Sequence, residues 1–265
     1  MNKKDSFENI KITAKGEPRA WVELEAIKTL WFNTGTLCNL QCGNCYIESS
    51  PVNDRLVFIT PKDIQKHLDE ISLLDHKGHI QESINIGLTG GEPFLNPDII
   101  DIIELILTYK LPLLILTNGT RLIRRFEKKL ILLSQLHPDL LNFRISLDHF
   151  TKQVHDQERG KGNFNKVINT LKWMSENDFN FTVAGRSLVT DSIIDTRKKY
   201  LELFLKEDIN LKTPEEIIIF PEMNAKKNPP EITEQCWSIL DKTPSSLMCA
   251  KERMIVKHKG DITTT

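Results

Sequence analysis

Three of the five cysteines in this 265-residue chain lie close together, at Cys38, Cys42 and Cys45, in the spacing Cys-x3-Cys-x2-Cys. No further Cys or His follows within the next twenty positions. A structural zinc ion takes four ligands, so three thiolates on one loop leave such a site incomplete. A four-iron cluster held by three thiolates keeps one iron open to a ligand that is not protein. The spacing therefore favours an iron–sulfur cluster with an open position over a zinc site or three incidental thiols.

A second group of residues, Gly90-Gly91-Glu92-Pro93, follows a short apolar segment. Glycines let the backbone approach a ligand closely, and a carboxylate accepts hydrogen bonds from an ammonium group. Two glycines before a proline are also common in a tight turn that binds nothing. The position after an apolar segment makes this group a candidate binding loop.

The cysteine spacing, followed by Gly-Gly-Glu-Pro, resembles the radical S-adenosylmethionine (SAM) superfamily, and the resemblance covers about residues 29–222. It implies a 4Fe-4S cluster whose open iron binds the methionine amino and carboxylate groups of SAM. It also implies reductive cleavage of SAM to a 5′-deoxyadenosyl radical, which abstracts hydrogen from a substrate, and an electron donor such as flavodoxin or ferredoxin. The protein contributes placement, electrostatics and the exclusion of water.

The resemblance also implies which residues contact SAM. The methionine end is expected on Gly90, Gly91 and Glu92. Further contacts are expected from residues near the ends of later strands, namely Asn118, Ser146, Asp148 and Arg186. Three of these have an ordinary alternative, because Asn118 can form a left-handed turn, Asp148 can cap a turn, and Arg186 can form a surface salt bridge.

Two other segments carry weaker expectations. The stretch from His155 to Gly162 resembles a loop of peptide-modifying superfamily members, so His155 or Arg159 is a candidate site residue, although a charged, glycine-rich loop is also typical of solvated surface. The position before the third cysteine is often aromatic in the superfamily and packs near the adenine. Here it is Asn44, and the aromatic Tyr46 follows that cysteine instead.

The elements that position these residues alternate between strand and helix. A strand over 20–32 leads into the cysteine loop. Further strands are expected at 84–89, 111–116, 142–147, 179–188 and 216–220, separated by helices at 61–74, 99–107, 121–135, 164–177 and 191–206. One helix between successive strands is the pattern of right-handed βαβ units in a parallel sheet. We therefore predict an α/β fold, a partial (β/α)6 TIM-like barrel with parallel strands, in which the candidate residues meet at the carboxyl ends of the strands.

Three parts of the chain are expected: a lead-in over 1–28, a core barrel over 29–225 and a short C-terminal extension over 226–265. Many superfamily members that act on peptides have a SPASM-like extension whose cysteines hold auxiliary clusters. Here the extension has only Cys236 and Cys249, too few to bind a cluster alone. The ending resembles a truncated or vestigial extension, and a lone cysteine such as Cys249 also serves as a small buried hydrophobe.

Composition narrows the class of protein. The formal net charge of -1 and the pI near 6.7 provide no electrostatic basis for binding nucleic acid or an anionic membrane. No apolar run approaches the roughly 18 to 20 residues of a membrane span, and the first residues have no apolar signal region. An odd number of cysteines, most of them in one loop, favours a reducing compartment, so we predict a cytoplasmic protein.

Taken together, these residues predict a radical SAM enzyme that acts on a peptide or protein. Two alternatives are a radical SAM enzyme that modifies a small metabolite and a non-catalytic protein that binds the iron–sulfur cluster and SAM. Appearance of 5′-deoxyadenosine from SAM separates an enzyme from a binding protein. A structural zinc protein is a third possibility, and metal analysis that finds zinc without sulfide would indicate it.

Overall fold

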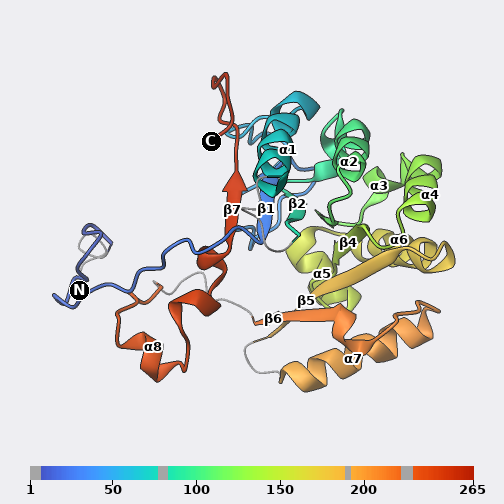
Figure 1. Ribbon diagram of the computed structural model, residues 1–265. Helices are drawn as coiled ribbons and strands as arrows, with labels where there is room; N and C mark the ends of the chain where they lie inside the picture. Colours follow the sequence, from blue (N-terminus) through green and yellow to red (C-terminus); the bar gives the residue numbers. More distant parts are fainter. Residues whose placement is uncertain (1–6, 77–82, 189–191, 222–228) are drawn as a thin grey trace. The chain divides into compact units, whose positions relative to one another are not determined.

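The computed structural model describes residues 7–76, 83–188, 192–221 and 229–265 (Figure 1). The chain divides into two compact units. Unit 1 comprises Met1–Thr29 with Asn224–Arg253, and unit 2 comprises Leu30–Met223 with Met254–Thr265. The predicted boundary between 225 and 226 falls outside the described residues, and the division into 1–28, 29–225 and 226–265 stays a prediction.

The sheet has seven strands in the order β6-β5-β4-β3-β2-β1-β7. Their bounds are β1 Thr29–Asn33, β2 Asn85–Thr89, β3 Leu113–Thr117, β4 Leu141–Ser146, β5 Asn180–Ser187, β6 Ile217–Pro221 and β7 Glu252–Ile255. Neighbours from β2 to β6 pair in parallel, for example Ile115 with Phe143 and Ile145 with Val183. The order is linear, so the sheet is open, and the predicted α/β class with parallel strands is confirmed.

Helices follow one another around the outside of these strands (Figure 1). Their bounds are α1 Pro61–His76, α2 Ile99–Thr108, α3 Arg121–Arg124, α4 Glu127–Leu136, α5 Lys152–Arg159, α6 Asn163–Glu176 and α7 Ile193–Lys206. Helix α1 begins where the sequence indicates, because the Thr60 hydroxyl accepts from the Asp63 N–H at 3.3 Å.

Two sequence-based expectations about helices were wrong. The single helix over 121–135 is broken into α3 and α4, because the N–H groups of Arg125 and Phe126 donate to Leu122 and Ile123 three residues back and close α3 after one turn. The segment interpreted as a charged loop contains helix α5, which ends at Gly160.

The core lies between the sheet and its helices. Along β4 the side chains alternate between buried and half-buried, and α2 presents the predicted apolar face, made of Ile99, Ile102, Ile103, Ile106 and Leu107. Burying one such side chain contributes roughly 1.5 to 3 kcal/mol. This packing holds the carboxyl ends of the strands, and so the loops that follow them, in fixed places.

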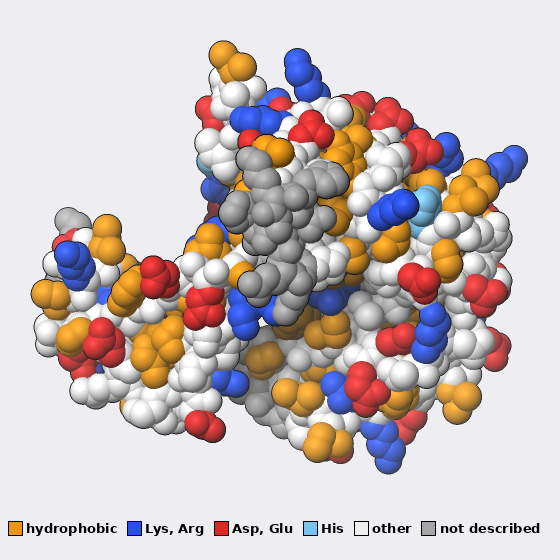
Figure 2. Space-filling view, in the orientation of Figure 1, with side chains coloured by type: hydrophobic (Ala, Val, Ile, Leu, Met, Phe, Trp, Pro, Cys, Tyr) orange, Lys and Arg blue, Asp and Glu red, His pale blue; other side chains and the backbone are white. Residues whose placement is uncertain are grey.

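Unit 1 is built differently. Glu231 connects its two chain segments, since its carboxylate accepts from the N–H groups of Phe7 at 3.0 Å and Ala14 at 2.8 Å and pairs with Arg19. The strand expected over 20–32 begins only at Thr29. This unit also contains α8 (Cys236–Ile239) and the short 3₁₀ turns Pro244–Ser246 and Met248–Ala250. Figure 2 shows its apolar side chains at the surface among charges of both signs.

The last residues of the chain belong to unit 2. The N–H of Val57 donates to the carbonyl of Lys257 at 2.9 Å, and the N–H of Lys259 donates to that of Arg55 at 3.0 Å. The Lys257 ammonium lies 2.8 Å from the Asp63 carboxylate in the first turn of α1. The segment after β7 is therefore attached to the start of α1.

Candidate active site

The cysteine loop follows β1 and is fastened to the end of β2. The N–H of Thr34 donates to the Thr89 carbonyl at 2.7 Å, and the Thr34 hydroxyl donates to the same oxygen at 2.9 Å. Farther along, the N–H of Cys38 donates to the carbonyl of Ser50 at 3.0 Å, which closes the loop on itself. These bonds determine where the first thiol lies.

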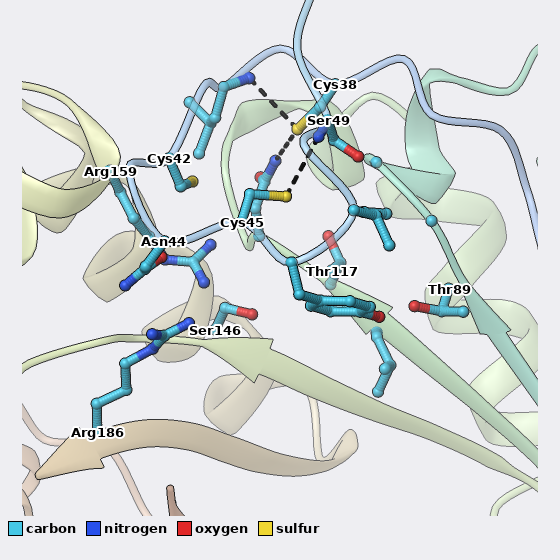
Figure 3. Close-up of a pocket in the computed structure, with 17 residues that line it drawn as sticks. Cys38, Cys42, Asn44, Cys45, Ser49, Thr89, Thr117, Ser146, Arg159 and Arg186 are labelled. Carbon is cyan, nitrogen blue, oxygen red and sulfur yellow. Dashed lines mark hydrogen bonds between the residues drawn. The ribbon is translucent and has the colours of Figure 1, made fainter. Parts of the chain in front are cut away.

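All three predicted thiols line one cavity of about 150 Å³ beside the ends of β2, β3 and β4 (Figure 3). Cys38 is buried, and its sulfur accepts from the N–H of Leu40 at 3.4 Å. The sulfur of Cys45 accepts from the N–H of Ser49 at 3.3 Å. The other lining residues come from the cysteine loop, from the strand ends and, for Arg159, from the end of α5: Leu40, Asn44, Tyr46, Ile47, Ser49, Thr89, Gly90, Gly91, Leu116, Thr117, Asn118, Ser146, Arg159 and Arg186.

The residues of this cavity fit an iron–sulfur cluster. Three cysteine sulfurs from one loop share it, and the ligands of an iron–sulfur cluster bind different iron atoms. Burial raises the pKa of Cys38 to about 11 and also raises the pKa of Cys42. Such thiols give up their protons when a metal binds them.

Gly90 and Gly91 pack directly against the cysteine loop. The N–H of Gly91 donates to the Gly35 carbonyl at 2.8 Å. Gly90 has φ +138°, and a Cβ there would lie 2.6 Å from the Gly35 carbonyl oxygen. A Cβ on Gly91 would lie 2.1 Å from the Leu37 carbonyl oxygen. Larger residues would separate the two loops, so both glycines are needed for this contact as well as for any ligand.

Glu92 is buried and is not among the residues that line the cavity. Its carboxylate accepts from the N–H of Phe94 at 3.1 Å, the hydroxyl of Thr117 at 2.7 Å and the N–H of Asn118 at 2.8 Å. Burial raises the pKa of Glu92 although these hydrogen bonds favour its ionised form. Glu92 thus ties the glycine turn to the end of β3, and its contact with SAM stays a prediction.

Asn118 connects the end of β3 to the cysteine loop. Its Nδ2 donates to Asn39 Oδ1 at 2.9 Å and lies 3.7 Å from the sulfur of Cys38. Its Oδ1 accepts from the N–H of Thr120 at 3.0 Å. The next residue, Gly119, has φ +66°, as the turn alternative expects. Asn118 therefore forms the turn and lines the cavity at the same time.

Asp148 also lies outside the cavity lining, where it holds two arginines. Its Oδ1 accepts from Arg159 Nη2 at 2.9 Å, and its Oδ2 lies 2.8 Å from Arg159 Nε. Arg186 Nε lies 3.5 Å from Oδ1. Burial raises the pKa of Asp148, but the charge and hydrogen bond of Arg159, together with the charges of Arg186 and His155, outweigh burial and leave that pKa below its usual value. Both arginines line the cavity together with Ser146 (Figure 3).

The segment from His155 to Gly162 divides between site and core. Arg159 enters the cavity, whereas His155 is fully buried and packs edge-to-face on Phe164, with ring centroids 5.7 Å apart. Burial lowers the pKa of His155 to about 4, so the imidazole is neutral at pH 7. The helix signals Thr151 and Gly160 bracket α5 in the sequence. If these two residues are interpreted as the start and end of a helix, the sequence predicts Arg159 at the helix end, beside β4.

Asn44 and Tyr46 both line the cavity, and Tyr46 is mostly exposed. Cys236 and Cys249 lie in unit 1. The sulfur of Cys236 accepts from the N–H of Thr233 at 3.4 Å, and Cys249 is exposed. Neither takes part in the cavity formed by unit 2.

The sequence pattern of the Radical SAM superfamily matches residues 32–204, a stretch that contains the three thiols and every residue of the cavity lining. The chain belongs to the radical SAM superfamily. This membership confirms the predicted cofactors, a 4Fe-4S cluster and SAM, and makes the zinc alternative wrong.

Individual radical SAM proteins show the same relationship. AlbA, the antilisterial bacteriocin subtilosin biosynthesis protein of Bacillus subtilis, is 31% identical over 148 residues, or 56% of this chain and 30% of AlbA. A probable GTP 3′,8-cyclase of Pyrococcus horikoshii is 32% identical over 135 residues, or 51% of this chain and 39% of the cyclase. This chain therefore aligns with well under half the length of either curated relative.

The fold has solved counterparts. Streptococcus suis SuiB, crystallised with S-adenosylmethionine, superposes with a TM-score of 0.57 at 13% identity, covering 88% of this chain and 51% of SuiB. This likeness confirms the predicted partial TIM-like barrel. Among the described residues of this radical SAM protein, no helix combines the length and the apolar character needed to cross a bilayer.

Proposed function

We propose that this chain is a radical SAM enzyme that abstracts a hydrogen atom from a peptide or protein. The observation that carries the chemistry is the placement of three thiols from one loop in a single cavity, bounded by the glycine turn and by the ends of the next strands. The substrate class is supported by similarity to AlbA, which is named for biosynthesis of the bacteriocin subtilosin. Bacteriocins are peptides or proteins.

Residues of unit 2 have distinct roles in this proposal. Cys38, Cys42 and Cys45 would hold the cluster, which when bound would supply the electron for reductive cleavage of SAM to a 5′-deoxyadenosyl radical. The backbone of Gly90 and Gly91 holds the methionine amino group. The side chains that reach the cavity from later strands complete the SAM site: Asn118, Ser146 and Arg186.

Among these side chains, the planar fork of Arg186 suits the methionine carboxylate, and the Ser146 hydroxyl suits the ribose. Glu92 and Asp148 act through the neighbours that they hold, because hydrogen bonds and ion pairs already occupy their carboxylates.

The decisive experiment is an anaerobic incubation. Reconstituted protein is reduced with dithionite and mixed with SAM, and 5′-deoxyadenosine is quantified by chromatography. The proposal expects 5′-deoxyadenosine from the wild type and from Cys249→Ala, and none from Cys42→Ala. Both variants remove one thiol, and only Cys42 belongs to the cavity. Absence of 5′-deoxyadenosine at full iron loading would favour a non-catalytic protein that binds the cluster and SAM.

A second candidate function is modification of a small metabolite. It is favoured by the 32% identity with the probable GTP 3′,8-cyclase of Pyrococcus horikoshii. GTP is therefore the natural probe: the peptide proposal expects that GTP neither accelerates SAM cleavage nor is consumed. Consumption of GTP would establish the metabolite alternative.

The electron source and the compartment complete the proposal. We propose flavodoxin or ferredoxin as the physiological donor, because the cluster needs one electron at low potential for each cleavage. Replacing dithionite by reduced flavodoxin in the same assay tests directly whether flavodoxin can donate the electron. The cytoplasmic location stays a prediction that rests on the clustered cysteines.

A further inference from the structure

Arg159 is brought to the cysteine loop by the end of helix α5. The carbonyl of Glu158, its neighbour, accepts from the N–H of Gly43 at 3.3 Å. Gly43 lies directly after Cys42 in the loop, so the last turn of α5 is hydrogen-bonded beside that thiol. Figure 3 shows Arg159 and Cys42 on the same side of the cavity.

The charged side chains that line this cavity are all cationic. Among the residues that line it are two guanidinium groups and three thiols, and none of the lining residues is Asp or Glu. Two buried carboxylates lie behind the lining: Asp148, which both arginines share, and Glu92. The lining itself therefore presents positive charge to whatever occupies the cavity.

Arg159 is only partly used by its carboxylate partner. Its side chain is 13% exposed, and its Nε and Nη2 atoms pair with Asp148. A guanidinium group has five N–H donors, so donors remain that can face an anion in the cavity. With Arg186 facing the methionine carboxylate, the anionic groups left for Arg159 are the thiolates that form when the cluster binds.

We propose that Arg159, held by Asp148, is the counter-charge of the cluster in this protein and raises its reduction potential. Arg159 is a positioning and electrostatic residue here, distinct from Arg186, which faces the methionine carboxylate. Reduction adds one electron, supplied by the external donor, to a group that three thiolates already make negative. A fixed cation nearby stabilises the reduced form more than the oxidised form. The inference rests on the proposed function, because it requires the cluster.

The test is a redox titration of the reconstituted protein without SAM, followed by electron paramagnetic resonance, with iron counted in each sample. Arg159→Gln removes the charge and is expected to shift the midpoint potential to a more negative value at unchanged iron content. Arg159→Lys keeps the charge and is expected to restore most of the shift. Lys129→Gln removes an exposed positive charge on α4 and is expected to leave the potential unchanged.

The outcomes separate the inference from the proposed function. A wild-type protein that forms no reducible cluster contradicts the proposed function. A wild-type cluster whose potential is the same in Arg159→Gln contradicts the role of Arg159 alone. If Arg159→Gln does not retain its iron, Arg159→His decides, because the charge of its side chain can be removed by pH alone. As the pH rises through the pKa of histidine, its potential is expected to fall further than that of the wild type, and an equal pH dependence overturns the proposal.

Discussion

The loop after β1 and the segment around α8 both carry cysteines, but the protein surrounds the two groups differently. In the loop, backbone and side-chain hydrogen bonds from β2, β3 and the loop itself reach the residues next to each thiol. Around α8, Cys236 has Thr233 as its hydrogen-bond partner and Cys249 is exposed. Thiols can bind a metal where the surrounding structure fixes their directions. The sheet and its loops fix the thiols of the loop after β1 in this way, and not those around α8.

This difference follows from where each segment begins and ends. The cysteine loop leaves β1, which lies between β2 and β7 in the sheet, so the start of the loop is held by the core. In unit 1, contacts such as the Arg19–Glu231 pair join two irregular segments, with several large apolar side chains exposed, among them Trp21, Ile239 and Met248. Rigid elements position functional groups more accurately than irregular segments do.

The strongest test of the comparison replaces one thiol in each region. Cys42→Ala is expected to remove cluster binding and SAM cleavage completely, because two thiolates cannot hold the cluster. Cys236→Ala and Cys249→Ala are expected to retain the full iron content. Iron and sulfide analysis after reconstitution measures this, and a loss of iron from either unit 1 variant would show that the two regions are not functionally separate.

The next largest effect is expected from the framework itself. Gly91→Ala places a Cβ at 2.1 Å from the Leu37 carbonyl oxygen, so the glycine turn and the cysteine loop must separate. We expect most of the iron binding to be lost in a protein that still folds, since the change lies at the loop and not in the core. Gly43→Ala is the control, because φ there is not positive and a Cβ would meet nothing nearer than the Glu158 carboxylate oxygen at 4.0 Å. Circular dichroism checks the fold, and full iron content in Gly91→Ala would contradict the framework argument.

A smaller effect is expected at Asn118. Asn118→Ala removes the donor to Asn39 and the contact with the sulfur of Cys38. Losing such buried hydrogen bonds costs about 1 to 3 kcal/mol. We therefore expect a cluster that still assembles but is lost faster to a chelator, with weaker SAM binding. If the variant loses its cluster at the same rate as the wild type, the role of Asn118 is limited to forming the turn.

The smallest effect concerns the end of the chain. Burial raises the pKa of Asp63, but hydrogen bonds from Lys257 and Thr60 outweigh burial and leave it below its usual value. This pair therefore stabilises the fold above the unfolded pKa of Asp, about 3.9, and the contribution is lost as the pH falls through the lower folded value.

Accordingly, Lys257→Met is expected to lower the free energy of unfolding by about 1 kcal/mol at pH 7, a modest value because the pair is partly exposed. The difference from the wild type should shrink below about pH 3.9. Urea denaturation of the apoprotein at several pH values measures it. A difference that does not depend on pH would assign the effect to packing of the lysine stem.

Much of the fold was predictable from the sequence because its signals are local. Apolar runs such as 111–116 and the Thr60-Pro61 helix start depend on neighbouring residues, and the structure has β3 and α1 there. The break between α3 and α4 was not predictable in the same way. It depends on Phe126, which packs against Phe94 from another part of the chain, with ring centroids 6.1 Å apart.

By itself, the sequence determined the chemistry: the spacing of Cys38, Cys42 and Cys45 and the Gly-Gly-Glu-Pro turn indicate the cluster and SAM, because ligand number and backbone freedom are properties of short segments. Only the tertiary structure decided which polar residues reach the cavity. Glu92 and Asp148 have the right residue types, yet their carboxylates are occupied by neighbours, while Arg159 enters the cavity from a helix end. The direction of a side chain depends on partners that are distant in sequence, and folding alone brings those partners together.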